Sequence, residues 1–113
     1  MGWRNDRLIR RGEEYQRDIR EKIASGARAE LMGSIGRGVH LLAKIKARRE
    51  LQWLLVNVAS ATLVACDEGM KMFVGTVDSG DIAQLRARER AMVLRYVPDL
   101  TERVVQAWKW DRE

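Results

Sequence analysis

The apolar residues of this chain gather in one uncharged run near its middle. Residues 51–66 spell LQWLLVNVASATLVAC and contain no charged side chain, whereas KIKARRE precedes them and DEGMK follows them. Apolar surface left in water costs about 25 cal/mol per Å². The run must therefore be buried in a core, against a partner or in a bilayer.

The spacing of apolar residues predicts one central helix over residues 39–66. Leu42 and Ile45 precede the uncharged run, and Leu55 and Val58 continue within it at helical spacing. A segment that is apolar around its whole circumference is typical of a buried helix. We therefore expect the other elements to pack around this segment.

A β-hairpin at 56–77 is the alternative for part of this segment, and it would make the fold α+β. Val56, Val58 and Val64 occupy alternate positions, and the sequence DEG that follows is a plausible turn. Periodicity alone does not distinguish a short buried strand from a buried helix. Both interpretations stay open at this point.

The first 25 residues predict a charged helix with one narrow apolar stripe. Leu8, Tyr15 and Ile19 recur at helical spacing, while most other positions are polar or charged. Such a stripe cannot stabilise a helix in water by itself. The segment 1–25 is therefore either an outer helix with one seam on the core or a protruding arm that clamps a partner.

Two further helices are expected near the end of the chain. Asp81 is followed three residues later by Gln84, and Asp99 by Glu102, which are capping-box patterns that start helices. Pro98 lies between them and ends the first.

The length of 113 residues suits a single domain with a modest core. We therefore expect residues 1–113 to form one all-α domain, a small bundle of four or five helices around the central helix.

Basic residues outnumber acidic ones by 21 to 16, which leaves a formal net charge of +5 at pH 7. Sixteen of the 21 are arginine, whose guanidinium group binds phosphate in a bidentate fashion. They gather in three clusters, at 4–11, 37–49 and 86–95, and convergence of these clusters in the fold would favour phosphate binding. The candidate phosphate contacts are Arg37, Lys44, Lys46, Arg48, Arg49, Arg86 and Arg90.

The glycine-rich sequence GSIGRG at residues 33–38 is expected to form a flexible loop. With its apolar flanks, from Leu31 to Ile45, it resembles the helix–GxxG–helix core of a KH domain. That family uses the loop to clamp a nucleic-acid backbone. The resemblance implies phosphate contacts at Arg37 and at the basic residues that follow it.

Residues that commonly carry catalysis or bind metals are scarce. His40 and Cys66 each occur once, too few for a zinc site. No set of nucleophile, base and orienting acid can be assembled around a single histidine. We therefore expect a protein that is not an enzyme and that needs no cofactor or metal.

These observations predict first an interaction or assembly module. It would self-associate or dock on a protein partner, as an accessory or structural subunit of a larger complex such as a virus particle. The expected interface comprises Leu8, Tyr15, Ile19, Trp108 and Trp110. Nucleic-acid binding through the arginine-rich helices and the loop from Gly33 to Gly38 is the alternative.

Membrane association through residues 51–66 is a further alternative, although the run is just shorter than a spanning helix and contains polar residues. The expected location is the cytoplasm or a larger assembly. The first residues are charged and unlike a signal peptide, and a single cysteine suits a reducing compartment.

Overall fold

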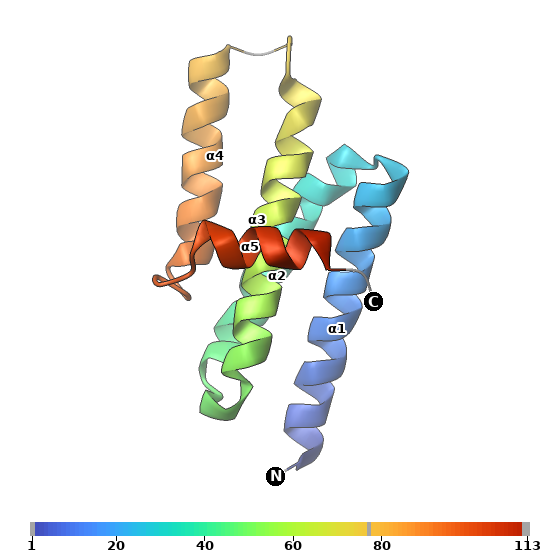
Figure 1. The fold of residues 1–113 in the computed structure, drawn as a ribbon, viewed down its shortest axis with the longest axis vertical. Helices are drawn as coiled ribbons and strands as arrows, with labels where there is room; N and C mark the ends of the chain where they lie inside the picture. Colours follow the sequence, from blue (N-terminus) through green and yellow to red (C-terminus); the bar gives the residue numbers. More distant parts are fainter. Residues whose placement is uncertain (1, 77, 112–113) are drawn as a thin grey trace.

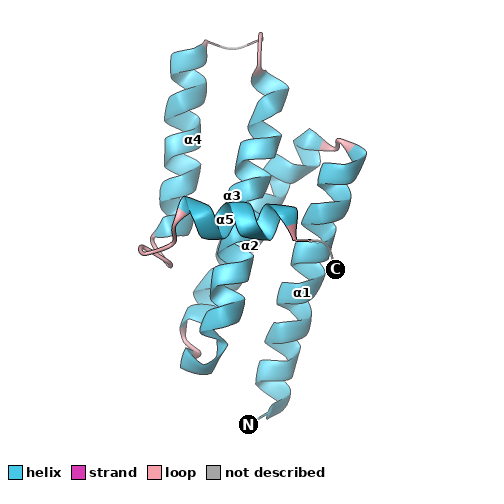
Figure 2. Cartoon of the chain, in the orientation of Figure 1, coloured by secondary structure: helices cyan, strands magenta, loops and turns pink. Residues whose placement is uncertain are grey.

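A computed structural model describes residues 2–76 and 78–111, and all regular elements in these ranges are helical (Figure 2). The fold is therefore all-α, as predicted. The α-helices are α1 (Gly2–Ser25), α2 (Arg28–Lys46), α3 (Gln52–Met70), α4 (Ser79–Leu94) and α5 (Glu102–Trp110). Two short 3-10 helices are η1 (Arg49–Leu51), before α3, and η2 (Lys71–Phe73), after it.

α3 lies at the centre of the molecule and contacts each of the other four α-helices. Figure 1 shows α1, α2, α3 and α4 running roughly along the long axis, with α5 crossing them. Every residue from Val58 to Cys66 is buried, so α3 is enclosed around its circumference. The prediction that the uncharged run is buried in a core is confirmed for most of the run, whereas Gln52 and Trp53 near its start are exposed.

The alternative β-hairpin at 56–77 is wrong for the part of this segment that the structure describes. Residues 56–70 belong to α3, and η2 and a turn with Gly75 at a φ of +81° follow. Because neighbouring helices cover α3 on all sides, a helix buries this run more completely than a two-faced strand would.

The predicted continuous helix over 39–66 is also wrong, because the chain turns at Ala47 and Arg48. α2 ends at Lys46, Arg48 is extended at a φ of −113° and a ψ of 98°, and α3 runs back along α2. No glycine or proline marks this turn. The turn lets the apolar faces of α2 and α3 bury each other, which outweighs the weak local preference to continue a helix.

The expected loop at residues 33–38 is instead two turns of α2, so the glycine-rich loop of the KH resemblance is absent. Glycine inside a helix costs about 1 kcal/mol relative to alanine. Burial of Ile35 in α2 helps to offset that cost. Gly38 also lies at a close helix contact, where a Cβ atom would overlap the hydroxyl oxygens of Tyr15 and Thr62.

The starts of α4 and α5 lie close to the predicted positions but use other caps. The side chain of Asp78 accepts a hydrogen bond from the Gly80 amide at 2.8 Å, so α4 begins before Asp81. The hydroxyl of Thr101 accepts from the Val104 amide at the start of α5. In both cases the cap is the polar residue directly before the first helical residue.

Among residues 2–76 and 78–111, no helix is both long enough and apolar enough to span a lipid bilayer.

Candidate functional site

Basic side chains from two helices line a groove of about 530 Å³ between the first half of α1 and the end of α2. We call it the basic groove. Its lining comprises Trp3, Arg4, Arg7, Leu8, Arg11, Lys44, Ala47 and Arg48.

Helix geometry places these cations in two rows that face one another. Arg4, Arg7 and Arg11 follow the spacing of three and four residues that keeps side chains on one face of α1. Lys44 lies in the last turn of α2, and Arg48 lies in the turn that follows this helix. Since α2 runs back along α1, the end of α2 lies beside the beginning of α1 (Figure 1).

The five cations of the basic groove form no ion pair within the described part of the chain. Arg48 alone is near enough to a carboxylate, Glu50, to add to the backbone hydrogen bond that lowers the pKa of that residue. The first turn of α1 has no acidic residue, so the positive end of its helix dipole adds to the same field. The groove therefore has an unbalanced charge that an anion would neutralise.

One aromatic ring stands at the end of the basic groove. Trp3 is 64% exposed, and the Arg4 guanidinium carbon lies 5.5 Å from the centroid of its ring. Covering an exposed indole with a ligand would remove apolar surface from water, which is favourable. The groove thus joins cations to an uncovered stacking surface.

A second hollow of about 490 Å³ continues the basic groove along α1 and α2, and Arg11 lines both. Its charges are mixed, because Glu14 and Asp18 on α1 lie opposite Arg37 on α2. Anion attraction is therefore concentrated in the basic groove.

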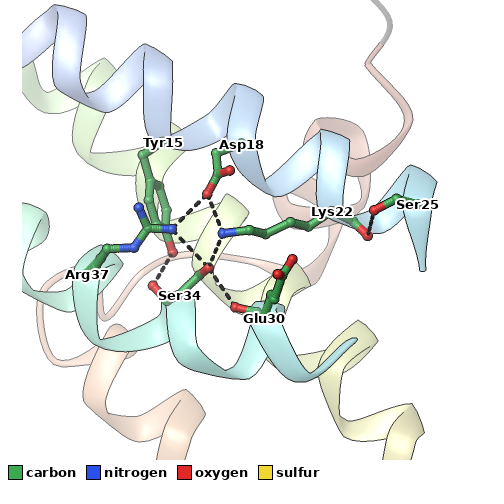
Figure 3. Close-up of polar contacts among 7 residues, drawn as sticks. All are labelled: Tyr15, Asp18, Lys22, Ser25, Glu30, Ser34 and Arg37. Carbon is green, nitrogen blue, oxygen red and sulfur yellow. Dashed lines mark hydrogen bonds and ion pairs between the residues drawn. The ribbon is translucent and has the colours of Figure 1, made fainter. Parts of the chain in front are cut away.

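Asp18 holds Arg37 in a polar network on the wall of this second hollow (Figure 3). Its Oδ2 atom accepts hydrogen bonds from Lys22 Nζ and from Arg37 Nη2, both at 2.7 Å. The hydrogen bond from Lys22, with that from Arg37, lowers the pKa of Asp18. Ser34 Oγ accepts from the same two cations, at 3.2 and 3.1 Å. Arg37, a predicted phosphate contact, is therefore already paired.

The structure separates the remaining predicted phosphate contacts. Lys44 and Arg48 lie in the basic groove, Lys46 donates to the Tyr96 carbonyl oxygen at 3.2 Å, and Arg49 is exposed in η1. Two of the seven predicted phosphate contacts, Lys44 and Arg48, therefore lie in the basic groove.

Two arginines of the third cluster, Arg86 and Arg90, are paired with carboxylates of neighbouring helices. Arg86 Nε lies 2.8 Å from Asp67 Oδ1, and Arg90 lies 3.1 Å from both Asp67 Oδ2 and Glu102 Oε2. These contacts join α4 to α3 and α5. Only the first two clusters therefore converge in the fold.

The basic cluster at 4–11 was predicted, but the predicted phosphate contacts did not include Arg4, Arg7 and Arg11. Their spacing on a single helical face was the available signal. That signal became decisive only when α2 supplied an opposite row.

Most of the predicted partner interface lies inside the chain's own core. Leu8, Tyr15, Ile19 and Trp108 are all buried, whereas Trp110 is 67% exposed. The narrow stripe of α1 is the seam by which this helix packs on the core.

The single cysteine and the acidic residues are the groups that could react as a nucleophile or bind a metal ion. Burial raises the pKa of the Cys66 thiol to about 11, so the thiol is protonated at neutral pH. No group of three or more histidine, cysteine, aspartate or glutamate residues in the described ranges is placed to hold a metal ion.

Comparison with protein-family models, with curated proteins and with solved structures gave no match.

Proposed function

We propose that this chain binds nucleic acid through the basic groove and catalyses no reaction. The observation that supports the proposal is the pair of opposed cation rows, one on α1 and one at the end of α2 and the turn after it. These cations form no ion pair within the described residues. Arginine predominates among these cations, and its guanidinium fork matches phosphate geometry.

Phosphate contacts of this kind have a measurable signature. Each neutralised phosphate releases condensed counterions, so the logarithm of the affinity falls linearly with the logarithm of the salt concentration. If all five cations of the basic groove engage, the slope is about −3.5 for a single strand and about −4.5 for a duplex.

A charge-reversal experiment tests the proposal directly. Binding of a labelled oligonucleotide is followed by fluorescence anisotropy at salt concentrations from about 50 to 200 mM. The double variant Arg7→Glu/Lys44→Glu places one reversed charge on each wall of the groove. We expect its affinity to fall by more than about tenfold and its salt slope to become shallower by at least about 1.4.

The matched control changes net charge equally at a distance from the groove. Arg88 on α4 and Arg103 on α5 are exposed and form no ion pair with described residues. The variant Arg88→Glu/Arg103→Glu should lose much less affinity. Equal losses in the two variants, or no binding to any DNA or RNA at low salt, would contradict the proposal.

An interaction or assembly role stays a prediction. Trp110 is the one exposed residue of the expected partner interface, so such an interface would have to be built around it. Light scattering on the natively purified chain, with and without Trp110→Ala, tests self-association.

A further inference from the structure

We infer that the basic groove takes a short segment of single strand, with one base stacked on Trp3, and that it discriminates against a duplex. This inference rests on the proposed nucleic-acid binding and specifies its substrate class.

The length of the cation row on α1 limits the number of nucleotides. Arg4 and Arg11 are seven residues apart on α1, which is about 10 Å along the helix axis. Charges of one duplex strand are spaced about 3.4 Å along the duplex axis, but successive phosphates along the backbone lie further apart, because the backbone winds about that axis. The row on α1 therefore spans a short segment of fewer than about four phosphates.

The flexibility of a single strand favours it over a duplex. The cations of the basic groove project from α1 and from the end of α2 and the turn after it. A single strand can bend its backbone to follow a positively charged groove, whereas the phosphates of a duplex are held on a rigid helical path. We therefore expect a duplex to engage fewer of the five cations.

Trp3 supplies a contact that only an unpaired base can use. Its indole is 64% exposed at the end of the groove, and Arg4 is 5.5 Å from its ring centroid. A base must leave its own helical stack to lie on an aromatic side chain. Aromatic stacking tolerates any base, so the strand would be bound with little sequence preference.

The first experiment compares strand forms. A labelled oligothymidine of about ten nucleotides and a blunt duplex of the same length are titrated by anisotropy at low salt. We expect the single strand to bind at least about tenfold more tightly. In competition, unlabelled oligothymidines should gain affinity steeply over the first few nucleotides and only slowly beyond. Equal or tighter duplex binding would overturn the inference while leaving the proposed function intact.

The second experiment tests the stacking contact. Trp3→Ala should lower affinity for the single strand by about tenfold and leave duplex affinity unchanged, whereas Trp3→Phe should retain most of it. Trp110→Ala is the matched control, because Trp110 is 67% exposed at the other end of the sequence and outside the groove. Circular dichroism establishes that each variant is folded. An unchanged affinity in Trp3→Ala would overturn the stacking contact.

The remaining outcomes separate this inference from the proposed function. If neither strand form binds, both fail together. Tryptophan and arginine also suit an anionic lipid surface. Sedimentation with vesicles of phosphatidylglycerol is therefore measured in parallel. Binding to vesicles without binding to oligonucleotides would assign the groove to a membrane surface and overturn the inference.

Discussion

The guanidinium group of Arg20 lies over the indole ring of Trp108, 3.9 Å from the ring centroid, and donates a 2.9 Å hydrogen bond to the Trp108 carbonyl oxygen. The same side chain donates to the Asp111 carbonyl oxygen at 2.8 Å. Trp108 Nε1 in turn donates to Gln16 Oε1 at 2.8 Å. Arg20 of α1 therefore binds backbone carbonyls at and just after the end of α5 and covers the Trp108 ring. These contacts fix α5 against α1.

Replacing Arg20 should loosen α5. Arg20→Ala removes the cation–π contact and two charge-assisted hydrogen bonds, so we expect the free energy of unfolding to fall by about 1.5–3 kcal/mol. Urea denaturation followed by circular dichroism measures the change. Arg17→Ala, an exposed position on the same helix, should stay within about 0.5 kcal/mol of the parent. Similar values for the two variants would show that the Arg20 contacts do not stabilise the fold.

Two glycines of α2 should respond to alanine in opposite directions. At Gly38 an added Cβ would overlap the hydroxyl oxygens of Tyr15 and Thr62, whereas at Gly36 no atom lies within 4 Å. Gly38→Ala should therefore lower the free energy of unfolding by about 1–3 kcal/mol, and Gly36→Ala should raise it by about 0.5–1 kcal/mol. Denaturant titration of both variants checks this. A neutral Gly38→Ala would contradict the close helix approach.

The buried hydroxyl of Tyr15 should make stability sensitive to alkaline pH. Tyr15 donates to the Ser34 carbonyl oxygen at 3.0 Å and lies 3.2 Å from Thr62 Oγ1 (Figure 3 shows the Ser34 contact). Burial raises its pKa from 10.0 to about 12. The unfolded chain therefore loses this proton first as pH rises, so the stabilisation is complete below pH 10 and is lost between pH 10 and about 12.

The variant Tyr15→Phe separates this titration from those of the lysines. We expect the difference in unfolding free energy between parent and variant to be about 1 kcal/mol near neutral pH. It should shrink by about 1.4 kcal/mol between about pH 8 and about pH 11, which is enough to reverse its sign, and by about 2–3 kcal/mol in total once the pH exceeds the folded pKa. Urea titrations at about pH 8, 10 and 11 measure it. A difference that is independent of pH would contradict burial of the ionisable hydroxyl.

Cys66 should be unreactive in the folded chain. Its side chain is fully buried in α3, and burial, with smaller effects from Asp67 and Glu89, raises its pKa to about 11. Because the thiolate is the reacting species, modification by a disulfide reagent at about pH 8 should be far slower than in denaturant. The reaction is followed by absorbance of the released thiol. Rapid modification without denaturant would show that α3 is accessible.

Local patterns in the sequence were sufficient for the helical class and for several faces. The seam of Leu8, Tyr15 and Ile19 and the burial of most of residues 51–66 followed from periodicity, because each depends on residues within a few turns of one another. Cap positions were displaced by two or three residues, since neighbouring polar side chains compete for the same amides.

The tertiary structure alone decided where the chain folds back and which charges remain free. The turn at Ala47 and Arg48 carries no local signal, and it forms because α2 and α3 then bury each other's apolar faces. The same turn brings Lys44 and Arg48 opposite the arginines of α1. Asp67 pairs with Arg86 and Arg90 of α4, which are 19 and 23 residues away in the sequence. Burial and ion pairing join residues that are distant in sequence, and a one-dimensional pattern of spacing does not contain those distances.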